Sequence, residues 1–331
     1  MPASEPPVLS VAELQVDYRE AEGHSVRILA GVELALKPGE ALGVLGESGC
    51  GKTTLARAIL GILPPAARVV GGSIRLAGRE LLGLPEAELE RIRGRSIAMI
   101  FQEPGLALSP VLRVGVQIAD VLRCQPGHRW AAPSERQRTV EELLARVRLP
   151  DPARIHDAYP HQLSGGQLQR VVLARAIAGG PRVLLADEPT SAVDATVQRE
   201  ILSILTGLRR ELGLALLFIS HDPALLAQVC DRILVMYAGT VAEMGDRDEI
   251  LSRPLHPYTR ALLACAPRRG HQGSHRLATI SGPPPDPARP PSGCRFEPRC
   301  GERLAACCEC EPLPTTPELD RQVRCFLYGG C

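Results

Sequence analysis

Short apolar runs alternate with helical patterns of apolar residues from Val8 to about Ala266. Runs of this length with few polar residues are typical of strands that are buried on both faces of a sheet. The last of these runs, Arg232–Tyr237, leads through a short turn into Val241–Met244, which predicts a hairpin. Because strands and helices alternate, we expect an α/β core. The candidate strands are Ala41–Leu45, Ile97–Phe101, Val183–Ala186, Ala215–Ser220 and Arg232–Tyr237.

The strand pattern lapses between Glu103 and Pro160, where Thr139–Arg148 has apolar residues at helical spacing. This predicts a helical subdomain, at about residues 103–170, inserted into the α/β core. Six prolines between Pro283 and Pro291 exclude a helix or a central strand and predict a stiff, extended connector. We therefore expect a core domain over residues 1–265 and a C-terminal extension over residues 266–331, in which a cysteine-rich tail follows the connector.

Length and charge limit the classes of function. A chain of 331 residues fits one large or two moderate domains. Its net charge of +1 carries no electrostatic signature of nucleic-acid binding, so we expect no nucleic acid as partner. No apolar run approaches the roughly 18–20 residues needed to span a bilayer. Because Met1–Glu5 lacks the features of a signal peptide, we expect the chain to stay in the cytoplasm and to reach a membrane only through partners.

The glycine-rich segment Gly46–Thr53 follows a candidate strand and opens into the helix-forming run Thr54–Leu60. This is the context that the P-loop pattern G-x-x-x-x-G-K-[ST] requires. The backbone N–H groups of such a loop cradle a polyphosphate, while Lys52 contacts the β- and γ-phosphates and the Thr53 hydroxyl binds Mg²⁺. A glycine-rich turn with an incidental Lys-Thr pair is the alternative, which the flanking strand and helix disfavour. The candidate residues for binding a nucleoside triphosphate are Gly46, Glu47, Ser48, Gly49, Cys50, Gly51, Lys52, Thr53 and Thr54.

Two carboxylates, Asp187 and Glu188, follow the apolar residues of another candidate strand. Asp187 can hold the Mg²⁺ opposite Thr53, and Glu188 could polarise an attacking water. Gln102 lies at the end of a further strand, where its amide can reach Mg²⁺ or water while its backbone hinges the helical insertion. The alternative for all three side chains is a solvated strand end.

Two more segments could contact phosphate. Leu163–Gln167 precedes the helical run Leu168–Ala178, and a serine hydroxyl with two glycine amides at a helix N-terminus forms a second phosphate-binding surface. The alternative is a simple helix that Ser164 caps. His221 follows the candidate strand Ala215–Ser220, although a single histidine in such a place is more often structural.

These motifs occur in the order found in ATP-binding cassette (ABC) proteins, which the chain resembles. The resemblance rests on the P-loop, Gln102, the Leu-Ser-Gly-Gly-Gln segment, the two carboxylates, the loop Ser191–Asp194 and His221. It implies a P-loop cassette fold that binds ATP and Mg²⁺, with Glu188, Gln102 and His221 as the catalytic residues and His221 as the γ-phosphate sensor.

In that family two ATPase domains meet head to tail, and each ATP lies between one P-loop and the signature motif of the partner. The resemblance therefore implies that four residues act in trans, on the partner's ATP. Tyr18 resembles the aromatic residue that stacks on adenine, although the neighbouring segment Arg19–Ser25 is longer than in many relatives. The residues implied to act in trans are Ser164, Gly165, Gly166 and Gln167.

Three segments near the C-terminus, His256–Leu263, Ser281–Pro285 and Gly293–Cys300, look like those of the ATPase subunits of oligopeptide and dipeptide importers. The resemblance implies an ATP-hydrolysing subunit, bound peripherally at the cytoplasmic face of the inner membrane. Its implied partners are a second ATPase subunit (paralogue or identical chain), two transmembrane permease subunits and an extracytoplasmic substrate-binding protein. Nickel and other small solutes are alternative cargoes, because similar ATPases serve them. A soluble cassette ATPase that acts on DNA or ribosomes is disfavoured by the single cassette and the net charge of +1.

Cysteines crowd at the end of the chain, where residues 294–331 hold seven of the eleven. In a reducing cytosol such crowding indicates metal or cluster binding more readily than disulfides. The importer resemblance implies a 4Fe–4S cluster, with structural Zn²⁺ as the alternative. Cys308, Cys310 and Cys331 are further ligand candidates, and free thiols or a redox- or metal-sensing tail are the other interpretations. The four candidate ligands are Cys294, Cys300, Cys307 and Cys325.

Overall fold

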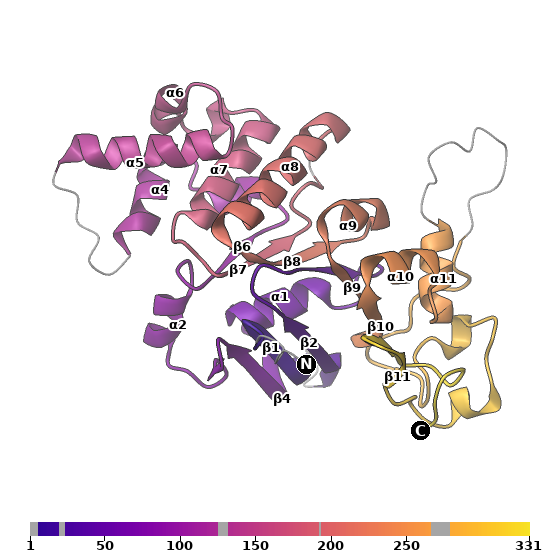
Figure 1. The fold of residues 1–331 in the computed structure, drawn as a ribbon. Helices are drawn as coiled ribbons and strands as arrows, with labels where there is room; N and C mark the ends of the chain where they lie inside the picture. The colour runs from indigo at the N-terminus through magenta and orange to yellow at the C-terminus, as the bar shows by residue number, and fades with distance from the viewer. Residues whose placement is uncertain (1–5, 20–23, 125–131, 192, 266–278) are drawn as a thin grey trace. The chain divides into compact units, whose positions relative to one another are not determined.

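A computed structural model describes residues 6–19, 24–124, 132–191, 193–265 and 279–331 (Figure 1). The predictions made for Met1–Glu5, for the insertion within Arg19–Ser25 and for Ala192 of the loop Ser191–Asp194 lie outside these residues, as does the first part of the predicted extension. The chain divides into two compact units. Of the described residues, unit 1 takes those within Met1–Val8, Leu36–Glu40 and Gly83–Leu217, and unit 2 takes those within Leu9–Ala35, Ala41–Leu82 and Phe218–Cys331.

Unit 2 contains an antiparallel sheet with the strand order β2-β1-β4-β5. Its strands alternate buried and exposed residues along much of their length, as strands with one solvated face do. A bulge interrupts the pairing of β1 with β4, where Glu13 has a φ of 47°. This sheet was not predicted from the sequence. The strands are β1 (Leu9–Arg19), β2 (Ser25–Leu36), β4 (Ala67–Leu76) and β5 (Arg79–Glu80).

Unit 2 also contains five strands in the order β11-β12-β10-β9-β3. The parallel pair β3 and β9 is almost fully buried, and β10 returns antiparallel to β9 in the predicted hairpin, which is confirmed. The C-terminal strands extend this sheet, because β12 pairs with β10. The bounds are β3 (Ala41–Leu45), β9 (Arg232–Tyr237), β10 (Thr240–Asp246), β11 (Thr315–Glu318) and β12 (Arg321–Val323).

Short helices complete unit 2. The helices α10 and α11 pack against β10, as Figure 1 shows in orange, and α9 packs against β3. Two 3-10 turns, η2 and η3, lie in the cysteine-rich part of the chain. The bounds are α1 (Lys52–Leu60), α9 (Pro223–Val229), α10 (Arg247–Ser252), α11 (Pro257–Cys265), η2 (Glu297–Arg299) and η3 (Ala305–Cys308).

Unit 1 combines the buried parallel strands β6 and β7 with helices. Between these strands the described residues form only helices and loops, and α4, α5, α6 and α7 pack together around Val114, Ile118, Val140, Leu144 and Ile155 (Figure 1, magenta). The predicted helical run Thr139–Arg148 falls largely within α5. The bounds are α2 (Glu86–Ile92), β6 (Ile97–Ile100), α3 (Pro104–Ala107), α4 (Val114–Arg123), α5 (Pro133–Arg146), α6 (Pro152–Asp157), η1 (Pro160–Gln162), α7 (Gly165–Ile177), β7 (Val183–Asp187) and α8 (Ala195–Leu212).

The candidate strands predicted from apolar runs are all confirmed, with small shifts at their ends. The strand from Ile97 ends at Ile100, one residue earlier than predicted, and the strand from Val183 includes Asp187. The remaining strand, β8 (Ala215–Ser220), is buried throughout and continues from unit 1 into unit 2. Within the described residues, no helix is long and apolar enough to cross a bilayer.

Candidate functional site

The P-loop connects β3 to α1 within unit 2. Gly51, at the N-cap of α1, has a φ of 106°, which residues with a side chain rarely adopt. A Cβ on Gly46 would lie 2.4 Å from the backbone oxygen of Met236 in the neighbouring strand β9. Both glycines are therefore required by the local backbone, one for its conformation and one for its close packing.

Lys52 lies across the start of this loop, with only 7% of its surface exposed. Its Nζ donates hydrogen bonds to the backbone oxygens of Gly46, at 2.7 Å, and of Glu47, at 2.9 Å. A buried ammonium surrounded by backbone groups is suited to contact a polyphosphate. Thr53 and Thr54, in the first turn of α1, are half-buried.

The other predicted residues of the ATP site divide between the units. Tyr18, near the end of β1, and His221, directly after β8, belong to unit 2 together with the P-loop. Gln102, Asp187, Glu188 and the segment Ser164–Gln167 belong to unit 1. Tyr18 is half-buried opposite Ala67 of β4, whereas His221 is exposed.

Unit 1 brings Gln102 and Glu188 together. The Gln102 amide Nε2 donates to Glu188 Oε2 over 3.3 Å, across 86 residues of sequence. Asp187, at the end of β7, is 3% exposed. Glu188 has a φ of 45°, an unfavourable conformation for a non-glycine residue of the kind that clusters at functional sites. Ser191 supports this turn, because its backbone N–H and its hydroxyl both donate to the Glu188 carbonyl.

The segment Ser164–Gln167 forms the N-terminus of α7. Ser164 Oγ accepts a hydrogen bond from the Gln167 backbone N–H, and Gln167 Oε1 accepts one from the Ser164 N–H. This capping box shows that the structural interpretation of Ser164 is correct. It does not exclude a contact with phosphate, because Ser164 and Gly165 are exposed. Gly166 faces Val197 of α8, and a Cβ there would lie 2.7 Å from Val197 Cγ1.

Two residues near the P-loop were missed by the sequence analysis. Arg299, the last residue of η2, forms an ion pair with Glu47 in which the closest atoms are 2.7 Å apart. Tyr258 in α11 accepts a hydrogen bond from the Glu47 backbone N–H over 3.0 Å. The two lie in segments that only the family resemblance distinguishes, and no local pattern connects them with a loop more than two hundred residues earlier.

Four of the C-terminal cysteines line one small cavity: Cys294, Cys300, Cys307 and Cys325. Burial raises the pKa of Cys294 to about 11, with smaller contributions from the three neighbouring thiols. Burial also raises the pKa values of Cys300 and Cys325. Among the described residues, no three His, Cys, Asp or Glu side chains form a ready-made site for a metal ion.

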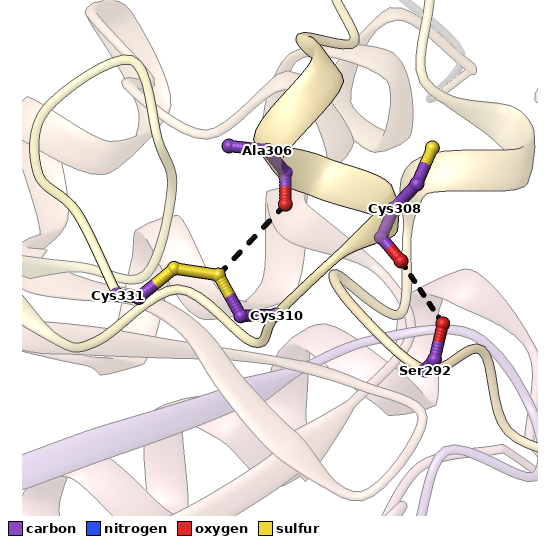
Figure 2. The surroundings of a disulfide bond; sticks show 5 residues. All are labelled: Ser292, Ala306, Cys308, Cys310 and Cys331. Carbon is purple, nitrogen blue, oxygen red and sulfur yellow. Dashed lines mark hydrogen bonds between the residues drawn. A yellow bond between two sulfur atoms is a disulfide. The ribbon is translucent and has the colours of Figure 1, made fainter.

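The remaining cysteines of this segment are arranged differently. Cys310 and Cys331 form a disulfide with Cα atoms 6.2 Å apart, so the expectation that crowding indicates metal binding rather than disulfides is wrong for this pair (Figure 2). Cys308 is exposed, and Figure 2 shows its sulfur pointing away from the disulfide. Its backbone oxygen accepts a hydrogen bond from the Ser292 hydroxyl over 2.9 Å.

Comparisons with known proteins agree with these features. Residues 29–191 match the ABC transporter family, and residues 242–307 match the C-terminal region of oligopeptide/dipeptide transporters. The dipeptide transport ATP-binding protein DppD of Bacillus subtilis is 40% identical over 321 residues, covering 97% of this chain and 94% of DppD. The oligopeptide transport ATP-binding protein OppD of Escherichia coli is 40% identical over 306 residues, covering 92% of this chain and 89% of OppD.

Solved structures give the same result for the fold. A dimeric bacterial ABC transporter cassette aligns with a TM-score of 0.64 and 29% identity, over 72% of this chain and 98% of the cassette. The same cassette in a post-hydrolysis state, bound to ADP and Pi, aligns with a TM-score of 0.65 and 28% identity, with the same coverage. The chain therefore belongs to the ABC transporter family and has its P-loop ATPase fold. Within that family it belongs with the ATP-binding subunits that carry the oligopeptide/dipeptide transporter C-terminal region.

Proposed function

We propose that this chain is the ATP-hydrolysing subunit of an importer for dipeptides or oligopeptides. The observation that carries the proposal is the combination, in one chain, of the cassette motifs with the peptide-transporter C-terminal region. Relatives named for dipeptide and oligopeptide transport match both parts over nearly their whole length. The cassette motifs supply ATP hydrolysis, and the C-terminal region distinguishes this group of transporters.

The P-loop residues bind the phosphates of ATP. Their fit to a polyphosphate is supported by the buried Lys52 ammonium and by glycines that leave no room for a Cβ. Lys52 binds the β- and γ-phosphates, and Thr53, Asp187 and Gln102 are the proposed Mg²⁺ ligands. Bound Mg²⁺ neutralises charge on the phosphates. Tyr18 stacks on the adenine ring.

Hydrolysis requires a positioned water. Glu188 acts as general base, and its contact with Gln102 supports this role because the amide orients the carboxylate. His221 contacts the γ-phosphate. Ser164, Gly165, Gly166 and Gln167 complete the ATP site of a second ATPase subunit, for which the exposed hydroxyl and amides at the start of α7 are suited.

The chain works as a peripheral subunit at the cytoplasmic face of the membrane. The helices at about residues 103–170 form a subdomain that transmits closure of the ATPase dimer to two permease subunits. An extracytoplasmic binding protein delivers the peptide. The domain division at residues 265 and 266 belongs to the same proposal and separates the cassette from the C-terminal extension.

We propose further that Cys294, Cys300, Cys307 and Cys325 of the C-terminal extension would hold a 4Fe–4S cluster. The support is that these four thiols line one cavity, whereas Cys310 and Cys331 are paired with each other. Four thiolates are the usual ligand set for such a cluster. When bound, such a cluster would link the loops of this segment, which is too small to build a core by itself, through its bonds to the four thiolates.

Transport is tested by reconstitution. The chain is co-expressed with the permeases, the second ATPase subunit and the binding protein encoded beside it, and the complex is placed in liposomes. We expect ATP-dependent accumulation of labelled di- or oligopeptides inside vesicles that carry the binding protein on the appropriate face. The complex with Glu188→Gln serves as the inactive control. Accumulation of nickel, with no peptide uptake, would overturn the peptide assignment.

The cluster is tested on protein purified without oxygen. We expect a brown protein with iron and acid-labile sulfide near four per chain. The double variant Cys294→Ser/Cys300→Ser should be colourless and should expose the tail to protease, while ATP still binds. Cys308→Ser is the matched control, because Cys308 is exposed and does not line the cavity; it should keep the colour. One zinc per chain in place of iron would refute the cluster.

A further inference from the structure

Glu47, the second residue of the P-loop, is bound by the C-terminal part of the chain. Arg299 Nη1 donates to Glu47 Oε2 at 2.7 Å, and Arg299 Nη2 donates to Glu47 Oε1 at 3.0 Å. This is the bidentate arrangement in which an arginine holds a carboxylate most specifically. The Arg299 side chain is only 5% exposed, so water competes little for these hydrogen bonds.

An aromatic cluster holds Arg299 in place. Its Nη1 also donates to the Tyr237 hydroxyl over 3.2 Å, and its guanidinium carbon lies 5.8 Å from the centroid of the Tyr237 ring. Tyr237, Tyr258 and Phe296 contact one another, with ring centroids 4.4–5.4 Å apart. Tyr258, which is fully buried, accepts the hydrogen bond from the Glu47 N–H.

All three polar groups of Glu47 are therefore engaged. Its backbone N–H donates to Tyr258, its carboxylate accepts from Arg299, and its backbone oxygen accepts from Lys52 Nζ at 2.9 Å. Glu47 thus connects the lysine of the phosphate site to two residues of the C-terminal segment. The proline-rich connector reaches the same region, because Pro284 and Pro285 line a cavity together with Glu47 and Ser48.

We infer that Arg299 and Tyr258 are positioning residues of the ATP site, which act through Glu47 on the P-loop and Lys52. Neither residue needs to touch the nucleotide. They hold the first turn of the loop, so that Lys52 and the following amides are oriented before ATP arrives. A loop that is already ordered loses less conformational entropy on binding, and its affinity is higher for that reason.

The consequence is that the C-terminal extension sets ATP affinity. Without the contacts to Glu47 the loop samples other conformations, and the apparent dissociation constant rises by the inverse of the competent fraction. If about one tenth of the population remains competent, ATP binds about tenfold more weakly. The rate at saturating ATP changes little, because bound ATP restores the same loop conformation.

The test compares ATP binding by the full chain and its variants, with a fluorescent ATP analogue and Mg²⁺. Arg299→Gln and Glu47→Gln each remove the ion pair from one side, and Tyr258→Phe removes the acceptor of the Glu47 N–H. Arg303→Gln is the matched control, since Arg303 lies in the same segment and pairs with Glu297 but is 64% exposed. Thermal unfolding of each variant checks the fold.

We expect a dissociation constant and a KM for ATP about tenfold higher in Arg299→Gln and Glu47→Gln, and in Arg299→Gln, which lies outside the P-loop, we expect kcat within about twofold of the parent. The double variant should be no worse than either single one, because both remove the same contact. Arg299→Lys should recover part of the affinity for ATP, and Tyr258→Phe should bind ATP about threefold more weakly than the parent. Arg303→Gln should bind as the parent does.

The inference is refuted if Arg299→Gln binds ATP as tightly as Arg303→Gln, or if the losses of Arg299→Gln and Glu47→Gln add. If Arg299→Gln fails to fold, Glu47→Gln and Tyr258→Phe decide the question. The inference rests on ATP binding and not on the proposed cargo. A complex that imports no peptide would refute the proposed function and leave this comparison valid.

Discussion

Replacing Arg321 by Met should weaken the attachment of the C-terminal strands more than any exposed ion pair could. Arg321 lies in β12 and is 2% exposed. It forms ion pairs with Glu243 at 3.0 Å, Glu249 at 3.2 Å and Glu318 at 3.0 Å. Glu243, in β10, is completely buried. Methionine keeps most of the apolar stem and removes the charge.

The size of the expected loss in stability depends on the Glu243 charge, which stays buried after Arg321 is replaced. Removing one partner of a buried ion pair costs about 3–5 kcal/mol, because the other charge stays buried without compensation. Glu243 keeps two hydrogen bonds, from the backbone N–H groups of Leu255 at 2.8 Å and His256 at 2.9 Å. We therefore expect a loss near the lower end, about 3 kcal/mol in the free energy of local unfolding.

Hydrogen exchange of the backbone amides in β10 and β12 measures this local opening directly. Arg253→Met is the control, because Arg253 also pairs with Glu249 but is 64% exposed and should cost less than about 1 kcal/mol. Adding Glu243→Gln to Arg321→Met should recover most of the loss, since no buried charge remains. Equal losses in Arg321→Met and Arg253→Met would refute the reasoning.

Three further predictions concern the ATP site and the response to pH. Glu188→Gln should keep ATP binding and slow hydrolysis by about 100-fold or more, measured as phosphate release; hydrolysis at the parental rate would remove Glu188 from the role of general base. Ser164→Arg should abolish hydrolysis while the single chain binds ATP with parental affinity, whereas a collapse of that affinity would contradict the action in trans. Burial lowers the pKa of His256 from 6.5 to about 4, so the unfolded chain binds the extra proton between these values. The free energy of unfolding should be highest above pH 6.5 and fall by up to about 3 kcal/mol as the pH drops to 4. Urea titrations should show a smaller fall for His256→Gln. If the parent and His256→Gln had the same pH profile, the pH dependence would not come from His256.

Local patterns were sufficient for much of the core and for the position of each ATP motif. The strands of the buried sheet, the hairpin after Tyr237 and the helix after the P-loop follow from apolar runs and turn residues that interact with near neighbours in sequence. The same holds for Ser164, whose capping partner Gln167 lies three residues away. The strands β1, β2 and β4 were not predicted; in β1 a bulge near Glu13 shifts the register of the pairing with β4.

The sequence by itself therefore determined the strands of the buried sheet, the helix after the P-loop and the order of the candidate ATP motifs. The tertiary structure decided which distant residues support them. The pair of Glu47 and Arg299 is 252 residues apart, and that of Glu243 and Arg321 is 78 residues apart. Likewise, only the tertiary structure brings Cys331 beside Cys310. The physical reason is that short-range patterns record contacts within a turn or a strand pair, whereas a contact between remote segments depends on how the whole unit packs.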